Sequence, residues 1–222
     1  MLRWLQRLGP ESSGLTEING RFLEMLQDGR HIFDASANCL LGGSDPEVIR
    51  EDLFETDVRI NKTEQRIRRE IVVHGSIHGA ATFPALLVMM SMVKDAERIG
   101  DYAKNIYDLA KHKPQLGSPA RVAELVERKD VISRMLVRAQ GLFESQDVEG
   151  AKAFLKEADA VEDQCDEEIE RLMRIEGDNV AGCVLAQRYF KRVTGHISNI
   201  VTSVVMPVDK LDYFPGKPHR EQ

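Results

Sequence analysis

The stretch Asp95-Ala96-Glu97-Arg98-Ile99-Gly100-Asp101-Tyr102-Ala103-Lys104-Asn105-Ile106 places two carboxylates, Glu97 and Asp101, four residues apart inside a helical pattern. Residues at this spacing are neighbours on a helix, so the two carboxylates repel each other unless a cation lies between them. A weaker copy follows about 94 residues later, as Lys191-Arg192-Val193-Thr194-Gly195-His196-Ile197-Ser198-Asn199-Ile200. The shared Arg and the shared Asn-Ile ending indicate an internal duplication, which predicts a protein built from two repeats.

Helix start and stop signals divide the chain into six long segments. Ser44-Asp45-Pro46-Glu47 is typical of a capping box with Pro at the first helical position, and Thr82-Phe83-Pro84 and Ser118-Pro119 indicate two further helix starts. We expect helices at 16–41, 46–73, 82–112, 119–145, 148–176 and 179–206. Short connections make neighbouring helices antiparallel. The sequence therefore predicts an all-α fold, a tandem duplication of an antiparallel three-helix bundle.

The expected division of the chain follows from the two repeats. A first three-helix repeat spans 16–112 and a second spans 118–206, with an N-terminal segment at 1–15 and a flexible tail at 207–222. Within each repeat, the middle helix carries a similar acidic stretch, Glu55–Asn61 in the first and Glu157–Asp163 in the second.

Composition and charge exclude several classes of function. The net charge is −6, and basic residues are interspersed with acidic ones, whereas binding to nucleic acid needs a concentrated basic face. The three cysteines, Cys39, Cys165 and Cys183, share no CxxC spacing and fit small buried residues in a reducing compartment. We therefore expect a cytoplasmic protein without a nucleic-acid partner.

One uncharged stretch raises the question of a membrane span. Ile71–Val93 contains no Asp, Glu, Lys or Arg, but its longest apolar part, Ala80–Val93, has only about 14 residues and is too short to cross a bilayer. We interpret the stretch as a turn followed by a buried helix start. The amphipathic segment Met1–Leu8, with Trp4, either contacts lipid or a partner or packs against its own domain.

Acidic residues on two predicted helices are candidate metal ligands. An apolar stripe on the third helix places Glu97, Asp101 and Asp108 on the opposite, surface face. If the second and third helices pack antiparallel, this row converges with one formed by Asp57, Asn61 and Glu64. Such oxygen ligands suit Mg²⁺, Mn²⁺, Ca²⁺ or iron. The alternative is a solvated acidic face balanced by Lys94, Arg98 and Lys104.

Motifs for catalysis are missing from the sequence. It has no E-x-x-H pair, H-E-x-x-H, Walker A, G-x-S-x-G or G-x-G-x-x-G. His74 and His78 are interpreted as helix-end residues, and His196, near Thr194 and Ser198, lacks the strand-turn-helix context of a catalytic triad. We therefore expect a protein without enzymatic activity.

The string from Glu97 to Ile106 resembles the "LERIGDxAxNI" motif of the PhoU family, the bacterial regulators of phosphate uptake, and the resemblance covers about 16–206. It implies two tandem three-helix repeats and a cytoplasmic regulator, peripheral at the inner face of the membrane. The implied partners are a phosphate transporter, either ABC-type or sodium-coupled, and a sensor histidine kinase. It also implies iron or another divalent metal bound by Glu97 and Asp101, with Asp57 and Asn61 on the preceding helix.

The second repeat departs from the family motif. Lys191 stands where the motif has an acid, and Gly195 stands where it has Asp. An ammonium at a ligand position opposes cation binding, so we expect metal in the first repeat only. The departure suggests a divergent member, for which a sodium-coupled phosphate transporter is the alternative to an ABC-type one. Two other functions stay open, a metal-binding or metal-storage protein and a plain helical adaptor, and a homodimer is one alternative for its assembly.

Overall fold

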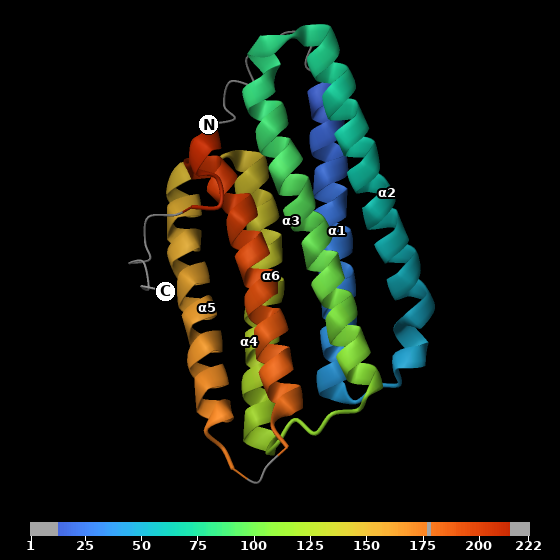
Figure 1. Cartoon of the computed structure of the whole chain (residues 1–222), viewed down its shortest axis with the longest axis vertical. Coiled ribbons are helices and arrows are strands. Elements are labelled where there is room, and N and C mark those ends of the chain that lie inside the picture. Colours follow the sequence, from blue (N-terminus) through green and yellow to red (C-terminus); the bar gives the residue numbers. More distant parts are fainter. Residues whose placement is uncertain (1–12, 177–178, 214–222) are drawn as a thin grey trace.

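The computed structural model describes residues 13–176 and 179–213, and within these ranges it is all-α with no β-strand (Figure 1). Six long helices follow one another, as predicted. Two short 3-10 helices, η3 at Ala80–Thr82 and η4 at Val208–Lys210, accompany them. The long helices are α1 Ser13–Gly42, α2 Pro46–His78, α3 Phe83–Lys111, α4 Pro119–Ser145, α5 Val148–Met173 and α6 Ala181–Val205.

Capping side chains start the helices close to the predicted positions. Ser118 accepts a hydrogen bond from the backbone N–H of Arg121 at 3.4 Å and so caps α4 as expected. At α2 the prediction of a capping box was wrong, because Asp45, not Ser44, is the N-cap and accepts from the N–H of Glu47 at 3.1 Å. An N-cap carboxylate satisfies one of the unpaired donors of the first turn.

The end of α2 differs most from the prediction. The helix continues five residues beyond the expected end at 73 and stops at Gly79, whose φ of 73° leaves the helical region. Gly75 lies within the helix, and the absence of a side chain leaves room for the ring of Phe83. A Cβ at this position would lie 2.9 Å from the ring. His74 and His78 therefore lie within α2, with their rings 4.2 Å apart. The predicted turn is limited to a few residues around η3.

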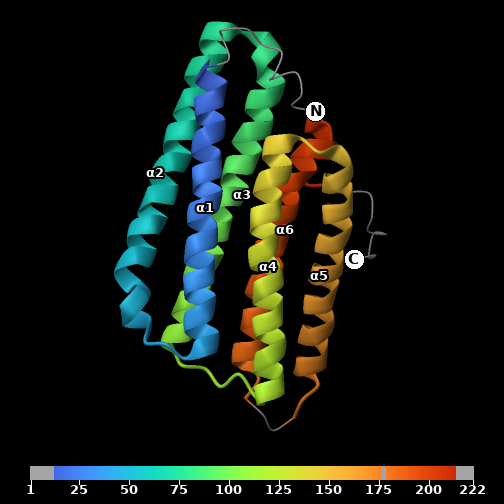
Figure 2. The same cartoon turned by 180° about the vertical axis from the view of Figure 1, so that it is seen from behind.

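Helices pack side by side in two halves that share one apolar core. In the first half α1 contacts both α2 and α3, and in the second half α6 contacts both α4 and α5. The halves meet through α3 against α6 and α1 against α4, and Figure 2 shows α1 and α4 next to each other from behind. The limits 16–112 and 118–206 for the two repeats stay a prediction.

Aromatic side chains join the two halves. The buried rings of Phe33 on α1 and Phe190 on α6 meet edge to face at 5.9 Å, and those of Phe22 on α1 and Phe143 on α4 do so at 5.0 Å. Such pairs add about 0.5–1.5 kcal/mol beyond the area they bury. The interface between the halves is therefore part of the hydrophobic core.

The three cysteines are buried and free, as predicted. Burial raises the pKa of Cys165 to about 11, so this thiol is uncharged at neutral pH and unsuited to act as a nucleophile. None of the helices in the described ranges combines the length and apolar character that a bilayer crossing needs. Met1–Leu8, including Trp4, lies outside the described residues, as does the tail after residue 213.

Candidate functional site

Helices α2 and α3 bring the two predicted rows of acidic residues together. The Nζ atom of Lys104 lies 2.9 Å from Oδ1 of Asp57 on α2 and 3.1 Å from Oδ1 of Asp101 on α3. One ammonium thus bridges two carboxylates from neighbouring helices. We call this region, formed by Asp57, Asn61, Glu64, Glu97 and Asp101, the α2–α3 ridge.

A second lysine bridges the ridge further along. Nζ of Lys94 lies 2.6 Å from Oε2 of Glu97 and 3.9 Å from Oε1 of Glu64. Arg68 also pairs with Glu64, at 2.9 Å. The expected convergence of the two rows is therefore present, with basic side chains between the acids.

The prediction that Glu97 is a surface group was wrong, whereas Asp108 does lie on the surface. Glu97 is only 9% exposed, because its position borders the apolar stripe and the packing of α2 on α3 covers it. Glu64, which faces it from α2, is buried as well. Asp108, about two turns beyond Asp101 on α3, keeps its side chain 60% exposed.

The charge state of Lys104 follows from its surroundings. Burial lowers the pKa of this ammonium, but hydrogen bonds to Asp57 and Asp101, together with their charges, raise it more, so the net pKa lies above its ordinary value. Lys104 is therefore protonated at neutral pH. It supplies the cation between Asp57 and Asp101, two carboxylates that face each other from neighbouring helices.

As the ridge is arranged, its residues do not fit a resident metal. Among the described residues, His, Cys, Asp and Glu side chains nowhere form a group of three or more that could hold a metal ion. Asn61 donates its amide to Oδ2 of Asp57 at 3.3 Å, and this bond uses an oxygen that a metal would need. Metal binding through Glu97, Asp101, Asp57 and Asn61 stays a prediction.

The second half carries a different arrangement at the equivalent place. Lys191, at the position of Glu97, forms an ion pair with Asp166 of α5. Gly195, at the position of Asp101, faces Glu162, and a Cβ there would lie 3.8 Å from Oε1 of that residue. Glu162 of α5 therefore lies next to the position that Asp occupies in the family motif.

A buried polar cluster between the halves went unrecognised in the sequence. Oδ1 of Asp95 on α3 lies 2.8 Å from Nδ1 of His196 and accepts a hydrogen bond from the amide of Asn199 at 2.9 Å, both on α6. The ring of His196 also stacks on Tyr102, with centroids 5.6 Å apart. The sequence offered one signal for this cluster. Asp95 lies four residues before Ile99, on the apolar side of the helix, and a carboxylate on an inner face needs hydrogen-bond partners.

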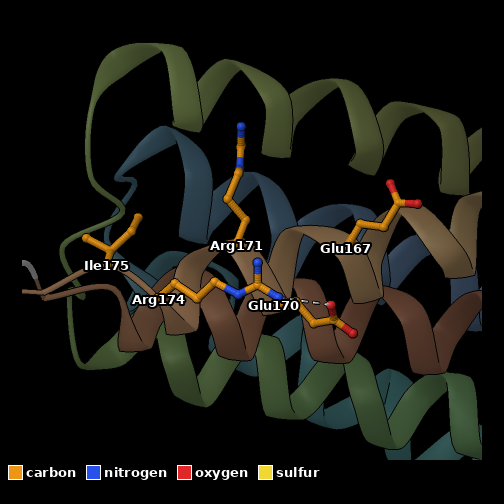
Figure 3. Close-up of a pocket in the computed structure, with 5 residues that line it drawn as sticks. All are labelled: Glu167, Glu170, Arg171, Arg174 and Ile175. Carbon is orange, nitrogen blue, oxygen red and sulfur yellow. Dashed lines mark ion pairs between the residues drawn. The ribbon is translucent and has the colours of Figure 1, made fainter.

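A surface pocket of about 380 Å³ lies at the C-terminal end of α5 and is lined by Glu167, Glu170, Arg171, Arg174 and Ile175 (Figure 3). Both of its arginines already have partners, since Arg174 turns back to Glu170 at 3.9 Å and Arg171 reaches Glu124 on α4 at 3.1 Å. The lining comes from one helix and its end, so the pocket lacks the convergent groups of a typical ligand site.

Comparisons with known proteins agree with the architecture. Residues 22–110, which span most of α1 to α3, match the family model of the PhoU domain. The crystal structure of PhoU from Pseudomonas aeruginosa is similar with a TM-score of 0.75 at 20% identity, covering 86% of this chain and 95% of that one. That of the phosphate transport system regulatory protein PhoU from Streptococcus pneumoniae reaches 0.74 at 18% identity, covering 86% and 92%. No curated protein matches the sequence.

Proposed function

We infer that this chain is a member of the PhoU family and that it regulates phosphate transport and phosphate homeostasis. The observation that carries the inference is the match of residues 22–110 to the PhoU domain. One protein of similar fold bears the name of a phosphate transport system regulatory protein. We propose a non-enzymatic, cytoplasmic role, exerted on a phosphate transporter of the ABC or sodium-coupled type and on a sensor histidine kinase.

Docking on other proteins is the mode of action that we propose. Along and beyond the ridge, α3 carries ion pairs that reach the surface, with Arg98 3.4 Å from Asp101 and Lys111 3.2 Å from Asp108. Exposed charges of this kind steer association and set specificity more than they add affinity. They support this face as a contact surface for a transporter component.

Peripheral association with the membrane is the second part of the proposal. The end of α2, the turn after it and the start of α3 project beyond the second half at one end of the molecule (Figure 1), and we call residues 72–87 the apolar tip. Its side chains are uncharged and include five exposed large apolar residues, Val72, Val73, Ile77, Phe83 and Leu87. The exposed Arg66 and Arg69 stand on the preceding turns of α2, where they favour anionic headgroups. An exposed apolar patch rimmed by basic residues suits a lipid surface.

Deletion of the gene tests the proposed regulation. In the deletion strain we expect faster phosphate uptake at high phosphate, and raised expression of a phosphate-responsive reporter, because restraint on the transporter is lost. Complementation with the intact gene should restore both readouts. Normal uptake and normal expression at both high and low phosphate would contradict the proposed regulation.

A further inference from the structure

We propose that Lys94 and Lys104 are built-in counter-cations of the α2–α3 ridge, so that two ammonium groups take the place of the metal ions that the family resemblance assigns to the paired acids. The ridge then works without a metal. This proposal stands on the geometry of the ridge and does not depend on the proposed role in phosphate transport.

Each lysine joins one carboxylate of α2 to one carboxylate of α3. Lys104 lies within 3.1 Å of both Asp57 and Asp101, and Lys94 lies within 3.9 Å of both Glu64 and Glu97. A lysine ammonium has three N–H donors and no acceptor, so one lysine can serve two carboxylates at once. These are the places between facing oxygens that a bridging divalent ion would occupy.

The charges of the ridge are balanced without a metal. Its carboxylates are those of Asp57, Glu64, Glu97 and Asp101, and each has a basic partner within 4.0 Å. The partners are Arg68, Lys94, Arg98 and Lys104. A divalent cation would have to displace a lysine and would leave the displaced ammonium among other positive groups. Since like charges at this separation repel, entry of a metal is opposed.

The second half supports the same principle. Lys191 stands at the position of Glu97 and pairs directly with Asp166 on the neighbouring helix. In both halves, therefore, the junction between the middle and the last helix is neutralised by a lysine on the last helix.

Metal content and thermal stability of the full-length protein test this proposal. We expect protein purified without chelator to contain iron, manganese and zinc far below one ion per chain by mass spectrometry. Its Tm should be the same with EDTA and with added Mn²⁺. A stoichiometric metal whose removal by EDTA lowers the Tm would overturn the proposal, and this measurement needs no variant.

The variant Lys104→Met provides the complementary test, because it keeps the length of the side chain and removes the charge. Asp57 and Asp101 then face each other without the cation that they share, so Mn²⁺ should bind there and raise the Tm of the variant, as any ligand specific for the folded state does. Lys111→Met is the matched control, since Lys111 pairs with the exposed Asp108 and lies over the ring of Tyr107, away from the ridge carboxylates. A folded Lys104→Met protein whose Tm Mn²⁺ leaves unchanged would count against the proposal, as would an equal rise in the control. If Lys104→Met does not fold, Lys94→Met replaces it under the same criteria.

Discussion

Asp95 is a carboxylate buried between α3 and α6, and its position depends on two partners from the other half of the chain. His196 and Asn199 both bond to its Oδ1 atom. A buried carboxylate is tolerated only when hydrogen bonds replace its hydration, and here one oxygen gathers both bonds. Asp95 therefore fixes the register between the two helices.

Asp95→Ala should lower the free energy of unfolding by about 2 kcal/mol, because it leaves the amide of Asn199 and the ring of His196 without their acceptor in a buried place. Urea denaturation followed by circular dichroism measures the change. Asp108→Ala, on the same helix but exposed, should change the free energy by less than about 0.5 kcal/mol. Equal effects of the two substitutions would show that the cluster contributes nothing to stability.

Sequence and structure differ most in the contacts between distant residues. Glu97, Asp101 and Asp57 could be placed together because helical spacing and antiparallel packing suffice to bring them close. The contact between Asp95 and His196 joins residues 101 positions apart. The periodicity within one helix does not predict which of its faces packs against the other half of the molecule. For the same reason, the pairing of Lys104 with Asp57 appeared in the sequence only as a general balance of charge.

The hairpin of α2 and α3 shows how well helix boundaries can be predicted. Starts were placed well because Pro46, Phe83-Pro84 and Pro119 fix the first turns. The end of α2 was missed because Gly75 reads locally as a helix breaker, while packing against Phe83 makes a glycine favourable there. Tertiary contact thus overrides local propensity, and the longer helix carries the exposed apolar tip.

Val73→Gln combined with Ile77→Gln should weaken binding to vesicles of phosphatidylglycerol and phosphatidylcholine by about tenfold or more, because two apolar side chains no longer enter the lipid interface. Co-sedimentation measures the bound fraction. Gln adds no charge, so attraction to anionic lipid is otherwise preserved.

The matched control for the apolar tip is Val48→Gln with Val58→Gln, at exposed apolar positions nearer the other end of α2. Ile77 is 70% exposed and Val48 is 79% exposed, so the pairs differ mainly in location. The control should bind vesicles like the parent. Failure of the parent to bind, or equal loss in both variants, would rule out the tip as the membrane contact.

The two halves of the molecule are related by an approximate symmetry that the interface reveals. Tyr102 and His196 stand 94 residues apart, at equivalent places in the two copies of the motif, and they stack on each other. Asp95 and Tyr189, also 94 residues apart, flank this pair, and Tyr189 lies 6.2 Å from Tyr102. Equivalent residues in mutual contact are expected where two copies face each other. The repeat was predictable from the sequence, but this face-to-face packing was not.

Because both halves share one core, we expect the molecule to unfold as a unit. Phe190→Ala removes a fully buried ring that packs on Phe33 of the other half, which should cost about 3–5 kcal/mol. Urea denaturation should show a single transition at a lower midpoint. Amide hydrogen exchange should accelerate in α2 as well as in α5, although α2 belongs to the other half.

The control is Phe54→Ala, at a ring that is 42% exposed on α2, and it should have a much smaller effect. Faster exchange confined to α4, α5 and α6 would instead mean that the halves open independently, and the interface of α1 and α3 with α4 and α6 would then be a contact between separate domains.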